Sequence, residues 1–559
     1  MRAKVLAAAV VLATGLACWA QPSGYVKKST WQETVLESRE ALAGQGAKAD
    51  RQQRGLIWRQ AERDFNSVGT LEEMTMEKVG RIWEADWKEG DYRAIGKRYA
   101  DATEGVVKYS PDPTAMSEYC AKARELAEKV STVEQLEDAR QIYYKAFREM
   151  EQAVLAEADR KIKEHRMGTL IIRAKPGAKV EVRQVRHDFL FGTSINDRMF
   201  AKKEDFQTGR KWLNDFDWLN DPNLYPFIER NRERYYQLIK DNFNCVVHQN
   251  AAKWFNVEPV EEGDVYWTSA ERACEWAMAN GLKMRGHCIL WDCERFVPEW
   301  QKTMDDAGVR RNVERRCKEA ATRFAGRIDK WDLNNEMLHC RWYRDRLGDE
   351  IVGDMFRWCK EANPDIVLCL NDFNILANEH TGRLNDYIAQ AREFLAKGYA
   401  LGQINCQGHS WDGDTNIGFT RFALNKLALV GLPIKISEYI IDDQADNKEY
   451  AAVMLEKHFR IFFSQPAVEG ILFWGVWEGT HFSPSDALWG VDFTPNAAGK
   501  AYRGLVFERW WTNWQGVADD KGKCEVPVFY GRHKITVDGK EIEVNFPKSE
   551  GREKAVELH

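Results

Sequence analysis

The 559-residue sequence has little excess of either charge, with 80 Lys and Arg against 86 Asp and Glu and a formal net charge of −6. These charges are spread along the chain rather than gathered into a basic stripe. Nucleic acids and anionic membrane surfaces are bound through clustered Lys and Arg side chains. The composition therefore predicts neither as a partner.

Closely spaced cysteine pairs are also lacking. None of the 12 Cys forms a CxxC pair, and Cys288 and Cys293 in "HCILWDC" are too far apart for a zinc knuckle. Several cysteines lie inside apolar runs, where the residue behaves as a small hydrophobe. We therefore expect no disulfide scaffold, no metal site and no cofactor.

The sequence has one apolar segment near its start, and it is short. In "MRAKVLAAAVVLATGLACWAQ", Arg2 and Lys4 precede the apolar stretch, and the small residues Cys18 and Ala20 follow it. This order is typical of a signal peptide over residues 1–20, and the stretch is too short to span a membrane. We expect a secreted, periplasmic or cell-surface protein. Lipid attachment at Cys18 ranks second, because Gly15 stands where a lipoprotein signal carries Leu.

Charged residues and helical periodicity dominate residues 21–165. Apolar residues recur at helical spacing, as in "STVEQLEDARQIYYKAFREMEQAVLAEADRKIKEH" (131–165). The segment is predicted to be a helical accessory region. A structural role is the default interpretation, and docking to a partner at the cell surface is the alternative.

Strand-like patterns appear on both sides of the central region. Alternating apolar residues around "KPGAK" (175–179) predict a β-hairpin over residues 166–187. The Asp-Gly turn in "VDGKE" (537–541) predicts another within residues 516–559. Because isolated hairpins are barely stable in water, we expect the two segments to pair into one small β-module.

In residues 188–515, apolar strand-like runs alternate with helical patterns. Eight alternations predict an α/β chain folded as a (β/α)8 TIM barrel. A doubly wound sheet is the second choice, since no Gly-rich phosphate turn follows the first run. The eight runs are residues 189–195, 244–250, 283–291, 329–336, 366–372, 404–410, 433–439 and 470–476.

Nearly every run ends in a polar or aromatic residue, which a barrel would gather at its C-terminal face. The two glutamates, Glu336 and Glu438, end runs four and seven. Two carboxylates with amides and Trp faces suit glycoside hydrolysis, in which one acts as acid and the other as base or nucleophile. The other strand-end residues are Gln249, Asn250, His287, Trp291, Asn335, Asn371, Asp372, Gln407, His409 and Trp474.

Metal ligation by His287, His409 and Asp292 is the alternative interpretation of this set. Barrels that use a metal often carry an H-x-H pair on one strand, and this sequence has none. Hydrolysis without a metal is therefore favoured.

Several motifs together resemble one family. They are "AAKWFNVEP" (251–259), "MRGHCILWD" (284–292), "WDLNNEM" (331–337), "LNDFNI" (370–375), "CQGHS" (406–410), "IKISEYIID" (434–442) and "ILFWGV" (471–476). In this order they are similar to the motifs of glycoside hydrolase family ten, the retaining endo-β-1,4-xylanases. The resemblance covers about residues 188–508.

The resemblance implies a role for each site residue. Glu336 would be the acid/base, Glu438 the nucleophile and Asn335 a contact to the sugar 2-hydroxyl. The two carboxyl groups of a retaining enzyme lie roughly 5–5.5 Å apart. The substrate would be a xylan-like polysaccharide. His287, Gln407, His409 and Trp474 would form the subsite around the cleaved bond, and Lys253 and Asn250 would bind the next sugar on the non-reducing side. Gln249 and Trp291 complete the implied sugar-binding set.

Three positions depart from the family pattern. Gln249 stands in place of a Glu, Asp292 in place of a His and Phe482 in place of a Trp. These changes fall where the family grips its substrate, and a buried hydrogen bond to a sugar hydroxyl is worth about 1 kcal/mol. Xylan is the default substrate. Another β-linked polysaccharide, or a barrel that binds glycan without cutting it, stays open.

Overall fold

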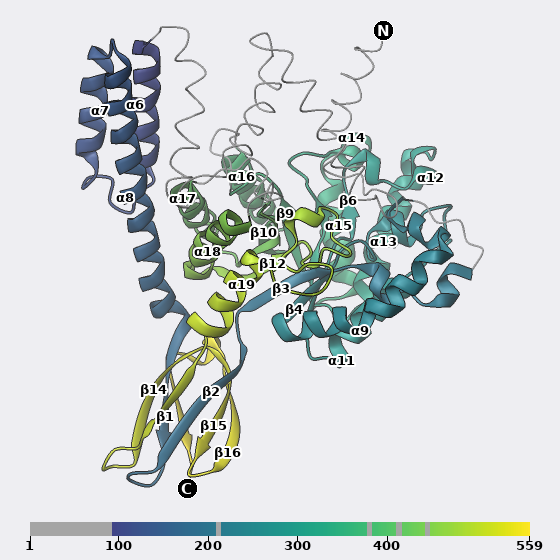
Figure 1. Ribbon diagram of the computed structural model, residues 1–559. Coiled ribbons are helices and arrows are strands. Elements are labelled where there is room, and N and C mark those ends of the chain that lie inside the picture. Colours follow the sequence, from purple (N-terminus) through teal and green to yellow (C-terminus); the bar gives the residue numbers. More distant parts are fainter. Residues whose placement is uncertain (1–91, 208–213, 377–382, 410–415, 442–447, 559) are drawn as a thin grey trace.

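The computed structural model describes residues 92–207, 214–376, 383–409, 416–441 and 448–558. The predicted signal peptide and Cys18 lie outside this part of the chain. The described residues form a helical bundle, a barrel beside it and a narrow β-module below both (Figure 1).

The first described segment is helical, which confirms the predicted N-terminal helical region. It comprises α6 (Tyr92–Lys108), α7 (Ser117–Lys129) and α8 (Val133–Arg166). The side chain of Thr132 caps α8 by accepting a hydrogen bond from the Gln135 N–H. The 34-residue α8 is longer than its bundle partners and continues along the side of the barrel to the β-module (Figure 1).

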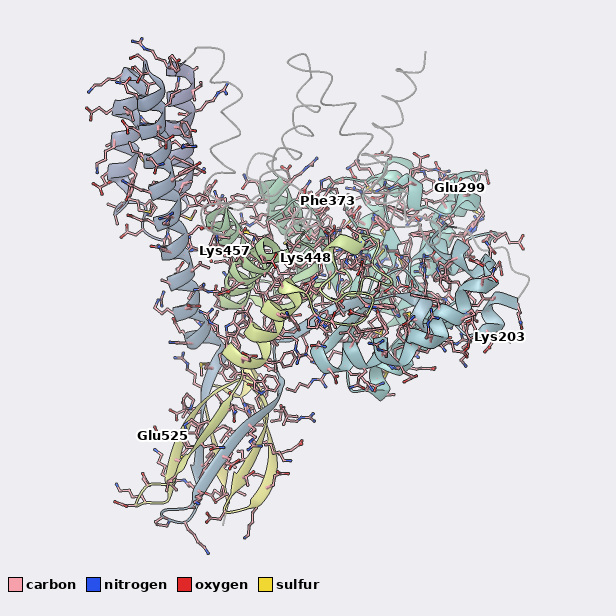
Figure 2. All side chains as sticks on the ribbon, in the orientation of Figure 1. Lys203, Glu299, Phe373, Lys448, Lys457 and Glu525 are labelled. Atoms are coloured by element: carbon pink, nitrogen blue, oxygen red, sulfur yellow. A yellow bond between two sulfur atoms is a disulfide. The ribbon has the colours of Figure 1, made fainter. Side chains whose placement is uncertain are left out.

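Helix α8 is fastened to the barrel by buried apolar contacts and by ion pairs. It packs against α17 (Ile417–Ala428) and α18 (Lys448–Ser464), and Met150 and Val154 join the same hydrophobic core as the barrel. Lys457 on α18 pairs with Glu151 at 2.8 Å. Figure 2 shows Lys457 on the side of the barrel that faces α8.

The β-module is a sandwich of two sheets that share one apolar core, with Val182, Val526 and Ile535 among its buried residues. Segments from both flanks of the barrel contribute strands, as predicted. One sheet has the order β14 (Lys523–Phe529), β1 (Met167–Arg173), β17 (Glu553–Glu557). The other has the order β13 (Asn513–Val517), β2 (Lys179–His187), β15 (Gly531–Val537), β16 (Lys540–Phe546).

The two predicted hairpins have different outcomes. The Asp-Gly hairpin is confirmed, since Val537 of β15 pairs with Lys540 of β16 and the turn residues Asp538 and Gly539 have positive φ. The hairpin over residues 166–187 is wrong. Strands β1 and β2 lie in opposite sheets, where each pairs with C-terminal strands and turns its alternate apolar residues toward the common core.

The central region is a closed barrel of eight parallel strands, and this confirms the predicted (β/α)8 fold. All eight apolar runs contribute a strand. In barrel order these are β10 (Leu401–Cys406), β11 (Ile434–Tyr439), β12 (Val468–Phe473), β3 (Leu190–Ile195), β4 (Cys245–His248), β5 (Lys283–Gly286), β7 (Lys330–Asp332) and β9 (Val367–Asp372).

Helices surround the barrel, and a short extra strand pair lies above it. That pair, β6 (Leu290–Trp291) and β8 (Asn334–Asn335), follows β5 and β7 in the chain and so extends from the C-terminal face of the barrel. The longer helices besides α17 and α18 are α9 (Tyr225–Asn242), α11 (Thr268–Ala279), α13 (Asp306–Arg323), α15 (Ile351–Ala362), α16 (Arg383–Ala396) and α19 (Ala497–Gly504). Short helices are α10 (Trp254–Val257), α12 (Glu299–Lys302) and α14 (Trp342–Leu347).

Membrane-spanning helices are not found among the described residues: each helix there is too short or too polar to cross a bilayer.

Candidate active site

The two strand-end glutamates are held by the backbone of neighbouring strands. The Glu438 N–H donates to the Gln407 carbonyl at 2.8 Å, and the Glu336 N–H donates to the Asn371 carbonyl at 3.0 Å. Glu336 follows β8 directly and has a φ of 60°, a left-handed conformation that is unfavourable for a side chain with a Cβ. Strained backbone of this kind concentrates at functional sites. Both carboxyl groups are buried, with residue exposures of 1%.

Glu336 is buried with hydrogen-bond donors on each oxygen. Trp291 Nε1 donates to Oε2 and Gln407 Nε2 donates to Oε1, each at 2.9 Å. Burial, together with the negative charges of Asp372 and Glu438, raises the pKa of Glu336 to about 8, against the lowering effect of the two donors. The carboxyl group is therefore protonated at neutral pH and can donate a proton.

Glu438 lies in the opposite electrostatic environment. Burial alone would raise its pKa, but the charge of His287 and a hydrogen bond from His409 outweigh burial and hold the pKa at about 2. His409 Nε2 lies 3.5 Å from Oε2, and His287 Nδ1 lies 3.9 Å from Oε1. Asn371 Nδ2 donates to Oε1 at 2.7 Å. Glu438 is therefore ionised and available as a nucleophile.

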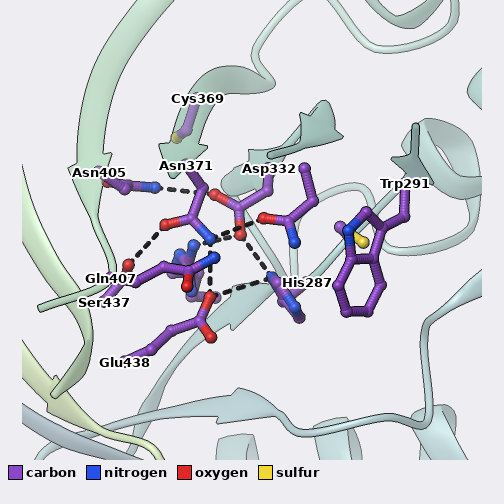
Figure 3. A network of polar contacts seen from close by, with 12 residues as sticks. His287, Trp291, Asp332, Cys369, Asn371, Asn405, Gln407, Ser437 and Glu438 are labelled. Carbon is purple, nitrogen blue, oxygen red and sulfur yellow. Dashed lines mark hydrogen bonds and ion pairs between the residues drawn. The ribbon is translucent and has the colours of Figure 1, made fainter. Parts of the chain in front are cut away.

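A polar network around Glu438 orients its carboxyl group (Figure 3). Asn371 Nδ2 also donates to Asn335 Oδ1 at 2.8 Å, and Asn371 Oδ1 accepts from Ser437 Oγ at 2.6 Å. Asp332 accepts from Asn405 Nδ2 and contacts His287 Nδ1, both at 2.8 Å. Asp332, Asn405 and Ser437 were not among the site residues predicted from the sequence. Their signal was a polar residue inside an otherwise apolar strand, which a buried position tolerates only with a partner.

The predicted sugar-binding residues on one side of the carboxyl groups lie together. Lys253 Nζ donates to Asn250 Oδ1 at 2.8 Å, and it lies over the rings of Trp291 and Trp474 at 4.6 and 5.6 Å. The His287 ring meets the Trp474 ring edge-on, with 5.1 Å between the ring centroids. This side therefore combines flat aromatic faces with an ammonium group and an amide, which suit a sugar ring with its hydroxyls.

The three departures from the family pattern take different places. Asp292 does not line the sugar-binding wall: it is fully buried and accepts from the Tyr343 N–H at 2.7 Å and from Arg344 Nε at 2.8 Å. Burial raises its pKa to about 6 despite these partners. Gln249 Oε1 accepts from Asn196 Nδ2 at 2.7 Å, and Phe482 packs against the cluster that contains Trp474. The expectation that Asp292 falls where the substrate is gripped is wrong, because its side chain is buried and binds the segment that follows Glu336.

A disulfide beside Glu336 was not expected. Cys293 and Cys340 are bonded, with their Cα atoms 4.7 Å apart and a sequence separation of 47. Each follows a strand-end site residue, Trp291 or Glu336, within four positions. Their similar positions after strand ends could have suggested that the two cysteines are close. Only the pairing of β6 with β8 brings the two segments together.

The metal alternative is not supported by the arrangement of the described residues. His287 contacts Asp332 and Glu438, while Asp292 is committed to Arg344 and the Tyr343 N–H. In the part of the chain that the structure describes, His287, His409 and Asp292 do not form a group with metal-ligand spacing.

The chain is similar in sequence to several curated proteins. Among curated proteins, the anti-sigma-I factor RsgI6 of Acetivibrio thermocellus is 35% identical over 306 residues, which are 54% of this chain and 39% of that protein. Endo-1,4-beta-xylanase 1 of Arabidopsis thaliana is 31% identical over 363 residues, 65% of this chain and 34% of that protein. The chain thus spans well under half the length of these two relatives.

Among solved structures, xylanase 10B from Thermotoga petrophila RKU-1 in complex with xylobiose superposes with a TM-score of 0.48 at 23% identity, covering 58% of this chain and 95% of that chain. The family model described as "Glycosyl hydrolase family 10" matches residues 226–504. This range runs from the helix after the first barrel strand to the last barrel helix and includes both glutamates. The central barrel of this chain therefore belongs to glycosyl hydrolase family 10.

Proposed function

We propose that the protein is a retaining glycoside hydrolase that cleaves β-1,4-xylan or a related β-linked polysaccharide. The observation that carries the proposal is a pair of buried carboxyl groups that lie in opposite electrostatic environments. The pKa of Glu336 is raised to about 8 and that of Glu438 is lowered to about 2. Such a pair assigns acid and nucleophile by environment alone.

In the first step, Glu438 attacks the anomeric carbon while Glu336 gives its proton to the departing glycosidic oxygen. The products are a glycosyl ester of Glu438 and a sugar chain with a new hydroxyl. Asn371 donates to the attacking carboxylate and to Asn335, so it holds the nucleophile beside the amide expected to contact the 2-hydroxyl.

In the second step, Glu336 acts as a base. Esterified Glu438 carries no charge, so one of the causes that raise the pKa of Glu336 disappears and its ionised form becomes easier to keep. Glu336 takes a proton from water, the water oxygen attacks the anomeric carbon, and Glu438 leaves as a carboxylate. Two inversions give overall retention.

The sugar on the non-reducing side of the cleaved bond is assigned to Lys253, Asn250 and the Trp474 face. The ammonium group and amide would bind hydroxyls, and the indole would stack on the apolar face of the ring. Gln249 is neutral where the family has a Glu, which supports a shifted preference among β-linked polysaccharides.

A barrel that binds glycan without cutting it is the second candidate. Two observations favour it: Gln249 is already engaged with Asn196, and one relative is named an anti-sigma-I factor rather than a hydrolase. The paired carboxyl groups speak against it, since binding alone does not need two buried acids of opposite protonation.

We also propose that the protein is exported, with residues 1–20 as the signal peptide and Cys18 as a secondary candidate for lipid attachment. A cell-surface partner for the helical region belongs to the same proposal. Mass spectrometry of the mature N-terminus would decide the first point. An N-terminus at Met1 would contradict export by this signal.

The test is reducing-end release from xylan, arabinoxylan, mixed-linkage glucan and algal galactans. Activity that disappears in Glu438→Ala and falls about 10²–10⁴-fold in Glu336→Gln would support the proposal. An aryl glycoside with a good leaving group should suffer less from Glu336→Gln in the first step, because it needs no acid. Release that persists in both variants would refute these roles. Binding without release from any polymer would favour the second candidate.

A further inference from the structure

The Cys293–Cys340 disulfide lies against Glu336. Cys293 Sγ is 3.8 Å from Glu336 Oε2, and the Cys340 N–H donates to the Glu336 carbonyl at 3.0 Å. The Trp342 N–H donates to the Asp292 carbonyl at 2.9 Å, and Arg344 pairs with Asp292. The segments that carry the two cysteines are thus held together by more than the disulfide. Reduction would leave the two sulfurs close to each other and to Glu336.

These three side chains have the donor set of a thiophilic metal site. Within the described residues, Cys293, Glu336 and Cys340 form the one such group, with donor atoms within 4.8 Å of one another. A tetrahedral Zn²⁺ with Zn–S of about 2.3 Å and Zn–O of about 2.1 Å places sulfur and oxygen about 3.6 Å apart. The observed 3.8 Å between Cys293 Sγ and Glu336 Oε2 fits that edge.

We propose that reduction of the disulfide converts the acid/base side of the active site into a binding site for a thiophilic divalent cation such as Zn²⁺. Both sulfurs and Glu336 would be its protein ligands, with water in the fourth position. A phosphine reductant and water would convert the disulfide to two thiols and phosphine oxide. Metal binding would then release the protons of both thiols and of the carboxyl group.

The surroundings of Glu336 favour a cation once the thiols are free. The negative charges of Asp372 and Glu438 act on this carboxyl group. Trp291 and Gln407 each donate to one lone pair of the Glu336 carboxylate, and the remaining lone pairs of its two oxygens can bind a metal. Lys253 opposes the site, but its ammonium group is held by Asn250 over the Trp291 ring.

Metal binding would remove Glu336 from catalysis, because a metal-bound carboxylate cannot carry the proton. This consequence rests on the proposed function, whereas metal binding itself does not. Zinc stoichiometry and the thiolate charge-transfer absorption of bound Co²⁺ therefore test the site independently of any hydrolysis.

The experiment uses the full chain, reduced with the phosphine, desalted without oxygen and compared with the oxidised chain. We expect one Zn²⁺ per reduced chain, none at this site in the oxidised chain, and Co²⁺–thiolate absorption only after reduction. Cys293→Ser and Cys340→Ser should abolish both signals, and Glu336→Gln should weaken zinc binding by about tenfold or more. Cys120→Ser, which removes a half-buried free cysteine on α7, is the matched control and should bind zinc as the reduced parent does.

In the hydrolysis assay, Zn²⁺ should slow the reduced enzyme by about tenfold or more, with recovery on adding EDTA, and leave the oxidised enzyme unaffected. The proposal is overturned by zinc binding that is equal in both redox forms, that persists in both serine variants or that disappears in Cys120→Ser. Loss of the near-UV circular dichroism on reduction would also overturn it, since the site needs the folded loops. A chain that binds zinc as described but hydrolyses no polymer would leave the site standing and refute the proposed function.

Discussion

The alkaline limb of the pH–activity profile should report the pKa of Glu336, and two substitutions should move it in opposite directions. Gln407→Met removes the donor to Glu336 Oε1. This donor stabilises the ionised carboxylate, so its loss raises the pKa above about 8. A hydrogen bond to a charged group is worth about 1.5–3 kcal/mol, or roughly one to two pKa units. The limb should therefore move up by about one unit.

Asp372→Asn should move the limb down. Asp372 is buried, and its negative charge raises the pKa of Glu336. A nearby charge shifts the pKa of a carboxyl group by about one to three units. Its removal should lower the limb by about one to two units. The amide also replaces an oxygen that accepts from the Leu338 N–H, so the melting temperature should be recorded alongside.

The assay is kcat/KM on a soluble xylan or an aryl xyloside between about pH 4 and pH 10 for the parent and both variants. Lys457→Met is the control, because it breaks the ion pair with Glu151 on the side of the barrel and should leave the limb in place. Movement of both site variants in the same direction, or of neither, would show that Glu336 is not the group responsible for the limb.

Three further predictions concern stability. The pKa of Glu336 is about 8 in the folded chain and 4.5 in the unfolded chain, so its contribution to stability is fully present below pH 4.5 and is lost as pH rises through 8. In urea unfolding, the free energy of unfolding of Glu336→Gln should therefore rise by roughly 4 kcal/mol relative to the parent between pH 5 and pH 9. A difference between the two chains that does not change with pH would contradict the buried acid. Arg166→Met should lower the free energy of unfolding by about 3 kcal/mol, since Arg166 donates to the carbonyls of Phe463, Gln465 and Val468. A urea midpoint equal to that of the parent would show that water replaces these hydrogen bonds. A chain truncated to begin at Met167 should melt roughly 5 °C lower or more, because α8 contributes Met150 and Val154 to the barrel core, whereas an unchanged melting temperature would make α8 a detachable appendage.

Local patterns accounted for much of this fold because they depend on nearest neighbours in sequence. Each of the eight apolar runs became a barrel strand, and the Asp538–Gly539 turn closes the hairpin expected there. The segment 166–187 shows the limit. Its two strands have the right pattern, but alternation specifies only which face is buried and not which strand is the neighbour. The C-terminal strands proved the better partners for β1 and β2.

The sequence by itself determined the strand-end positions of Glu336 and Glu438, since chain order and the direction of parallel strands place strand ends on one face. Only the tertiary structure decided which carboxyl group keeps its proton, because that depends on burial and on charges brought from other strands. The tertiary structure also decided the Cys293–Cys340 disulfide, whose two cysteines are 47 positions apart in sequence. It likewise decided the partners of Asp292, which lie about 50 positions away. The spacing of residues in the sequence does not predict which residues meet across the barrel rim. These contacts arise when the core closes and the rim segments meet.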